Sequence, residues 1–249
     1  MILRRLAANL KQQNWTAIWI EFALLVAGVF LGLQVSNWNE ERRDQALAQE
    51  YLERLRDDFT RSIKRAETNI ARMDVQFVLE GDMVGRLRAC HLDDDQRADF
   101  AKGIYLVGRL EAPALVRGTI DELQSTGRMG IIRNLKVRQR LSDIAEGQES
   151  DTQILGFIVA RATPQIAYVD SKAILLQQSD GFGVDGPSSD QVVFDFPTLC
   201  RDPAYLGAVS TLQELTKVVI RQNHRAIAAD RAMVKLLDGE IGRNTGTAK

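Results

Sequence analysis

Apolar and polar residues follow two patterns along the chain, and both predict helices. The first is an apolar segment from Thr16 to Val35, in which Phe22 to Leu33 contains no charged residue. After it, apolar residues recur every three or four positions with charged residues between them, which is the period of an amphipathic helix. These apolar positions are Leu52, Leu55, Phe59, Ile63, Ala66, Ile70, Met73 and Phe77. A coiled-coil stalk shares this pattern with a bundle helix, but Ala66 and the aromatic residues break a strict Leu and Ile seam, which favours the bundle.

The same helical spacing continues to the C-terminal region and predicts an all-α protein. We expect an N-terminal transmembrane helix that continues into the long amphipathic helix, followed by an antiparallel helical bundle. The amphipathic helix is predicted to end near Cys90, and a shorter helix to cover residues 96–110. Thr119 and Glu122 match a capping box at the start of a short helix that Gly127 ends.

Three further signals set the boundaries of the later helices. Asn134 is predicted to cap a helix that reaches Pro164, which either kinks it or starts a new helix to Gln178. Asp202 followed by Pro203 predicts the start of a last helix that ends near Leu237. Residues 179–201 read as a long loop around a short apolar patch, and residues 239–249 as a disordered tail, so the soluble helical domain is predicted over residues 39–238.

The apolar segment has the features of a membrane anchor. About 20 residues at a rise of about 1.5 Å each span a hydrocarbon core of about 30 Å. Trp15 and Trp19 at one end and Trp38 at the other lie where interfacial tryptophans are found, and Glu21 lies near the end, where it can snorkel. A small-residue cleavage site is missing after Leu33, so the sequence predicts an uncleaved anchor over residues 16–38 and a short cytoplasmic segment over residues 1–15.

One face of this anchor predicts self-association. A step of about 100° per residue places Ala17, Glu21, Gly28 and Gly32 on the same side of the helix. Gly28 and Gly32 form a G-x-x-x-G pattern, which permits close approach of two helices in lipid. The expected partners are therefore the bilayer, a second copy through this helix and an unidentified protein.

The charges next to the anchor favour a cytoplasmic N-terminus. Arg4, Arg5 and Lys11 precede it with no acidic residue, whereas Arg42 and Arg43 follow it among acidic residues. The positive-inside rule depends mainly on Lys and Arg, and the numbers of these residues before and after the anchor are nearly equal. The sequence thus predicts a single-pass protein of the inner membrane with an extracytoplasmic soluble domain.

Overall charge and cysteine content narrow the function further. The net charge is −1, from 32 Lys and Arg against 33 Asp and Glu, so there is no basic excess of the kind that nucleic-acid binding needs. The two cysteines, Cys90 and Cys200, match no metal-ligand spacing. They can form one disulfide outside the cytoplasm, but the interpretation favoured from sequence is two buried thiols that act as small hydrophobic side chains.

Three segments resemble a bacterial family of uncharacterised single-pass membrane proteins. The anchor carries Glu21, Leu24, Gly28 and Gly32 and then reads L-Q-V-S-N-W-N-E-E-R from Leu33 to Arg42, similar to that family's A-L-Q-I-N-N-W-N-E motif, with Gly32 and Ser36 in place of Ala and Asn. Tyr51 to Leu55 with Asp58 and Phe59 looks like its next block, and Glu122 to Gly127 like its E-L-x-S-x-G segment. The resemblance implies a membrane-anchored helical domain of unknown function and no catalytic residue.

No pattern in the chain predicts catalysis, a cofactor or a metal. The run Asp93 to Asp95 beside His91 lacks the spacing of a calcium loop and predicts a solvated turn, and His224 reads as an exposed helix residue. Carboxylates at 180, 185 and 190 lie in a Gly-rich loop and support only weakly a calcium site or a hydrolase. The function predicted first is a protein-interaction or scaffolding module, and the alternative is an extracytoplasmic ligand-sensing bundle that acts through a partner.

Overall fold

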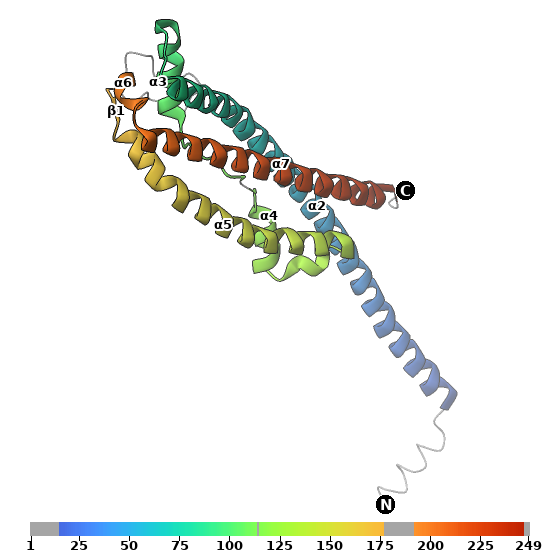
Figure 1. Ribbon diagram of the computed structural model, residues 1–249. Coiled ribbons are helices and arrows are strands. Elements are labelled where there is room, and N and C mark those ends of the chain that lie inside the picture. Colours follow the sequence, from blue (N-terminus) through green and yellow to red (C-terminus); the bar gives the residue numbers. More distant parts are fainter. Residues whose placement is uncertain (1–14, 114, 177–191, 247–249) are drawn as a thin grey trace, which may run out of the picture. The chain divides into compact units, whose positions relative to one another are not determined.

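The computed structural model describes residues 15–113, 115–176 and 192–246, and it confirms an all-α fold. Its elements are mainly long helices, joined by short helices and one small strand pair (Figure 1). The chain divides into two compact units, Met1–Glu50 and Tyr51–Lys249, which are described separately below.

Helix α2, Trp15–Ala89, contains both of the patterns that the sequence shows. In the first unit, its apolar side chains are exposed, among them Leu24 at 68% and Phe30 at 60%. Among the described residues, α2 is the one helix with a stretch long and apolar enough to cross a membrane.

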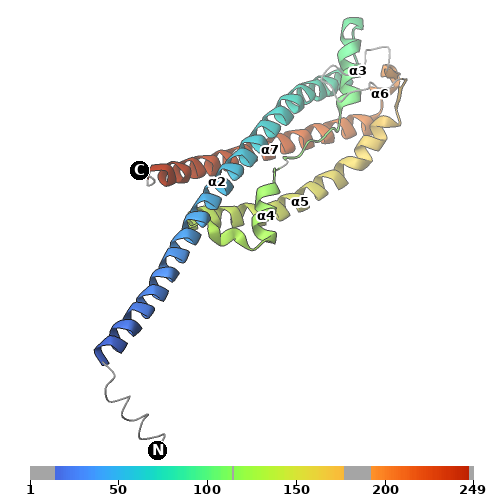
Figure 2. The ribbon, with the colours of Figure 1, turned by 180° about the vertical axis from the view of Figure 1, so that it is seen from behind.

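The second unit is a bundle built on three long helices. They are the later part of α2, α5 (Leu135–Asp170) and α7 (Pro203–Gly246). Helices α5 and α7 run in opposite directions along each other, as both views show (Figures 1 and 2). The shorter elements are η1 (Asp94–Gln96), α3 (Arg97–Leu106), α4 (Gly118–Ser125), η2 (Arg128–Ile131), β1 (Ala173–Leu175), β2 (Val192–Phe194) and α6 (Phe196–Leu199).

The predicted apolar stripe of α2 faces the core of this bundle. Leu52, Leu55 and Phe59 are at most 2% exposed, and Met73 is equally buried, whereas Ile63 and Phe77 at the edge of the stripe are partly exposed. Gly81 of α2 lies against the Gln213 side chain of α7: a Cβ there would come 2.8 Å from Nε2 of Gln213, whose flexible end would have to move. The bundle interpretation of the stripe is therefore confirmed.

Two predicted helix caps are confirmed. The Asn134 side chain accepts hydrogen bonds from the amides of Lys136 and Val137 at 2.9 and 3.4 Å. Oδ1 of Asp202 accepts from the amides of Ala204 and Tyr205 at 2.9 and 3.2 Å, with Pro203 in the first position of α7. Both side chains satisfy amides that have no partner within their helix.

The predicted capping box at Thr119 is wrong. Helix α4 starts one residue earlier, at Gly118, and Thr119 is buried inside it. Glu122 turns away from the helix start and accepts a hydrogen bond from the Tyr51 hydroxyl at 2.8 Å. The stop at Gly127 is confirmed, because this residue adopts a left-handed φ of 67° directly after α4.

Three other helix ends differ from the sequence prediction. Helix α3 is shorter than predicted, and α5, which continues through Pro164 as one of the two alternatives predicted, ends at Asp170 and not at Gln178. The apolar patch around Val192 forms β2, which pairs antiparallel with β1. Helix α7 continues beyond Leu237 to Gly246, through most of the predicted tail.

The interpretation of Cys90 and Cys200 as two separate thiols is also wrong. They form a disulfide with a Cα–Cα distance of 5.1 Å, between the end of α2 and the end of α6. Cys90 adopts a left-handed backbone with a φ of 49° just after α2. The bond ties the start of α7 to the end of α2 across 110 residues of sequence.

Replacing both cysteines by serine should lower the free energy of unfolding of the full chain by about 4 kcal/mol, because the bond removes loop entropy from the unfolded chain. Chemical denaturation followed by circular dichroism measures the difference. Reduction of the wild-type chain should reproduce the loss, and the same reductant should leave the double variant unchanged. Equal stability of the two oxidised proteins would contradict the prediction.

Candidate functional site

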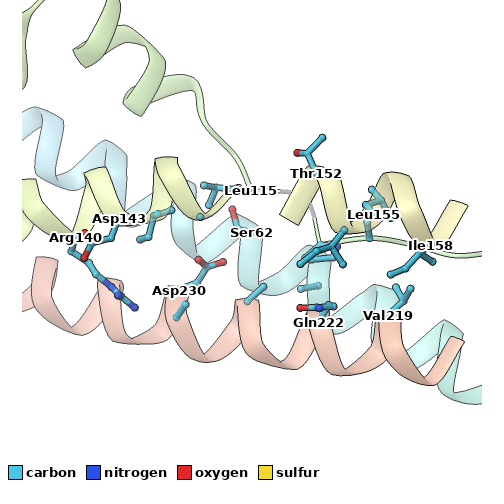
Figure 3. A pocket seen from close by; sticks show the side chains of 18 residues that line it. Ser62, Leu115, Arg140, Asp143, Thr152, Leu155, Ile158, Val219, Gln222 and Asp230 are labelled. Atoms are coloured by element: carbon cyan, nitrogen blue, oxygen red, sulfur yellow. The ribbon is translucent and has the colours of Figure 1, made fainter. Parts of the chain in front are cut away.

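The second unit contains a cavity of about 300 Å³ between α2, α5 and α7 that is partly open to solvent (Figure 3). Apolar side chains form most of its wall, and a few polar ones interrupt them. The lining residues that matter below are Ser62, Arg140, Asp143, Ile158, Ala226 and Asp230. A volume of this size matches the lower range of small-molecule pockets.

Asp230 is the buried carboxylate of this cavity. It projects from α7 toward the cavity and is 7% exposed. Among the described residues, neither a hydrogen bond nor an ion pair to its carboxylate is found. Burial raises the pKa of Asp230 to about 6, so that the side chain is still mostly ionised at pH 7.

The sequence places Asp230 there because it occupies a core position of an amphipathic helix. Val219, Asn223, Ile227, Asp230 and Met233 recur every three or four residues and are all buried. A carboxylate in such a position normally has a partner, because an isolated buried charge is costly.

Four polar side chains hold the chain segment that closes one side of the cavity. This segment connects α3 to α4 and contributes Ala112, Pro113 and Leu115 to the lining. In this segment, Ala112 O accepts from Asn69 Nδ2 (3.4 Å), Glu111 O accepts from Asn223 Nδ2 (2.9 Å) and Val116 N donates to Ser62 Oγ (2.8 Å). Directly after it, in the first turn of α4, Thr119 N donates to Asp58 Oδ2 (3.1 Å). These contacts explain why Asp58, Ser62 and Asn223 are buried in otherwise apolar helix faces.

One end of the cavity is charged. Arg140 and Asp143 lie there on adjacent turns of α5 (Figure 3). Arg140 is partly exposed and Asp143 is exposed, whereas Asp230 is only 7% exposed. Access to the cavity is therefore polar at this end and the interior is apolar.

A second buried carboxylate, Glu80, links three elements away from the cavity. Its Oε1 accepts from Gln76 Nε2 (2.8 Å), Thr216 Oγ1 (3.1 Å) and Gly108 N (3.4 Å), while Oε2 is buried without a partner in the described residues. Glu80 is fully buried, and this burial raises its pKa to about 7 against the lowering effect of the three hydrogen bonds. The group binds α2 to α7 and to the turn after α3.

A third polar cluster joins α4 to α2. Glu122 of α4 accepts from the Tyr51 hydroxyl and pairs with the Arg54 guanidinium of α2. The hydrogen bond from Arg54 is the largest cause that lowers the pKa of Glu122. Tyr51 is buried at 2%, so this contact docks α4 on α2.

The residues that the sequence predicts for anchoring lie elsewhere, in the first unit. Trp19 and Trp38 are exposed at 65% and 61%, and Arg42 lies over the Trp38 ring at 5.1 Å. No described atom lies within 4 Å of a Cβ built at Gly28 or at Gly32, so both glycines are open to contact. Trp15 and Glu21 belong to α2, but their side chains are outside the described part.

The acidic segments and histidines considered in the sequence analysis show no metal site among the described residues. Asp93 caps η1, and His91 to Asp95 form an exposed turn, as predicted. His224 is exposed on α7, also as predicted. The carboxylates at 180, 185 and 190 lie outside the described residues. Within the described ranges, no three His, Cys, Asp or Glu side chains gather in a group that could hold a metal ion.

Sequence reasoning missed Asp230, Arg140 and Glu80. The signal for the two carboxylates was present as an acidic residue at a core position of each helical stripe. The cavity itself has no sequence signal, because its lining comes from three helices and a connection that are far apart in the chain.

Comparisons with protein-family models, with curated proteins and with solved structures give no match to this chain. The resemblance to the uncharacterised single-pass family therefore stays a prediction.

Glu80 should make the bundle less stable as pH rises from about 5 to 8. The folded protein keeps this proton up to a pKa of about 7, whereas the unfolded chain loses it near 4.5, so the stabilisation present at low pH disappears through this range. The loss amounts to about 2 kcal/mol, and Asp230, with a raised pKa of about 6, adds to it in the same direction.

Urea denaturation of the full chain at pH 5 and at pH 8 measures this slope. Glu80→Gln should flatten it and should be more stable than wild type at pH 8. Glu214→Gln, which removes a charge from an exposed position of α7, is the control and should keep the wild-type slope. Identical slopes for Glu80→Gln and wild type would show that Glu80 does not titrate in this range.

Proposed function

We propose that this protein is a membrane-tethered domain that binds a small molecule in the cavity between α2, α5 and α7. The observation that carries the proposal is Asp230, a buried carboxylate that faces this cavity without a partner among the described residues. A buried charge without a partner destabilises a protein by several kcal/mol, so a retained one indicates a function.

The membrane tether is part of the proposal. The exposed apolar side chains of α2 before residue 36 and the flanking tryptophans support insertion in a bilayer. The disulfide between Cys90 and Cys200 supports an extracytoplasmic position of the soluble domain, because such bonds persist in oxidising compartments. Arg4, Arg5 and Lys11 support the same orientation.

A protein-interaction module is the second candidate, and an exposed aromatic side chain on the outer face of α5 favours it. Phe157 is 69% exposed and does not line the cavity. Phe157→Ser should abolish recruitment of a protein partner if this face binds one. The same change should leave ligand binding unaffected, since Phe157 does not line the cavity.

Filling the cavity should abolish binding without unfolding the bundle. The full chain in nanodiscs is screened by thermal shift against small apolar and amphiphilic molecules, and bound ligand at 100 times its Kd adds about 2.7 kcal/mol of stability. Ala226→Leu places a larger side chain in the cavity wall and should weaken each specific ligand at least tenfold, about 1.4 kcal/mol.

Ala228→Leu is the matched control, because it makes the same change at an exposed position of α7. Ligands of the cavity should bind this variant as they bind wild type. A screen in which every hit binds Ala226→Leu and wild type equally would reject the proposal.

The orientation has its own test with the two native cysteines. In intact cells, a maleimide that does not cross the inner membrane should label the protein only after treatment with a reductant that also stays outside. The variant with both cysteines replaced by serine is the blank. Labelling that appears only in lysed cells, without any reductant, would place the domain in the cytoplasm.

A further inference from the structure

We infer that the ligand of this cavity is an organic monocation with an apolar body, an amphiphilic amine whose ammonium group binds Asp230. The inference rests on the proposed function and specifies the ligand class for the same site.

The position of Asp230 supports a cationic group in the ligand. Asp230 projects into the cavity from α7, the residue is 7% exposed, and no described side chain or backbone group donates to its carboxylate (Figure 3). An ammonium group supplies both the missing counter-charge and the missing hydrogen-bond donors. The Ser62 hydroxyl lines the same cavity, and it donates to Asp58 O while it accepts from Val116 N. One lone pair of this oxygen is left for a further N–H of the ammonium group.

The charges around the cavity favour a single positive charge. The described lining contains two carboxylates, Asp143 and Asp230, and one guanidinium, Arg140. An anionic ligand would have to place its charge near the buried Asp230 or remain at the exposed end with Arg140. A monocation brings the net charge of the described lining to zero.

The walls argue against a metal ion as this cation. Calcium and magnesium need about six oxygen ligands, and the described lining offers one buried carboxylate. Most other positions are apolar, among them Ala66, Ile158, Val219 and Ala226. Such walls bind a hydrocarbon or aromatic group, and a cavity of about 150 Å³ already holds benzene in another protein. The volume of about 300 Å³ therefore has room for one ring with a short alkyl chain.

Three probes with one apolar body test this inference: 4-phenylbutylamine, 4-phenylbutan-1-ol and 4-phenylbutanoate. Each is titrated into the full chain in nanodiscs at pH 7.5, and empty nanodiscs correct for partition into lipid. The amine should bind wild type at least tenfold more tightly than the alcohol, which corresponds to about 1.4 kcal/mol for the ion pair. Asp230→Asn should abolish this preference and leave alcohol binding within about threefold of wild type.

Asp143→Asn is the matched control, since it removes the same charge from the exposed end of the same cavity. It should keep most of the preference for the amine. An equal loss in both variants would show that net charge, and not Asp230, selects the ligand, and would overturn the inference.

The failures of the two proposals are distinguishable. If the alcohol binds as tightly as the amine and Ala226→Leu abolishes both, the cavity binds ligands but the cationic class is wrong. If the butanoate binds best, Arg140 selects an anion and the inference is equally wrong. If no probe binds in a manner that Ala226→Leu changes, both proposals fail.

Discussion

The bundle depends on hydrogen bonds from buried polar side chains to the backbone that connects α3 and α4. Asn69 and Ser62 of α2 and Asn223 of α7 bond to this connection, and Asp58 of α2 bonds to the first turn of α4 that follows it. A connection outside helices and strands has no regular backbone–backbone hydrogen bonds. It can therefore lie beside a core only where side chains form hydrogen bonds with its amides and carbonyls. Because these bonds hold the connection beside the helices, a space remains that apolar side chains line but do not fill.

The two buried carboxylates, Glu80 and Asp230, differ in their surroundings. Glu80 has three donors from three elements, which is the arrangement of a structural group. Asp230 is less deeply buried, at 7% exposure against 0% for Glu80, and faces an open volume in place of donors. Within one bundle, Glu80 therefore links helices to each other, whereas Asp230 is available for an external partner.

The sequence could predict the elements well where the signal is local. Asn134, Gly127 and the pair Asp202 and Pro203 mark helix ends through their own side chains or backbone, and the period of the α2 stripe identifies its buried face. Thr119 and Glu122 led to a wrong capping prediction, because the same T-x-x-E pattern also occurs where these side chains form tertiary contacts. Glu122 instead pairs with Arg54 of α2 and accepts from the Tyr51 hydroxyl, so that its carboxylate is used between two helices. The cavity, the role of Asp230 and the disulfide depend on residues far apart in sequence, and no local pattern encodes them.

The disulfide has a consequence for the biogenesis of this chain. With two cysteines there is one possible pairing within the molecule, so correct oxidation needs an oxidant and no isomerase to sort alternatives. Cys200 follows α5 in the chain, so the bond can close only after the polypeptide has turned back along its own length. The one competing product is a covalent link between two chains, which becomes more frequent as the local density of newly made protein rises.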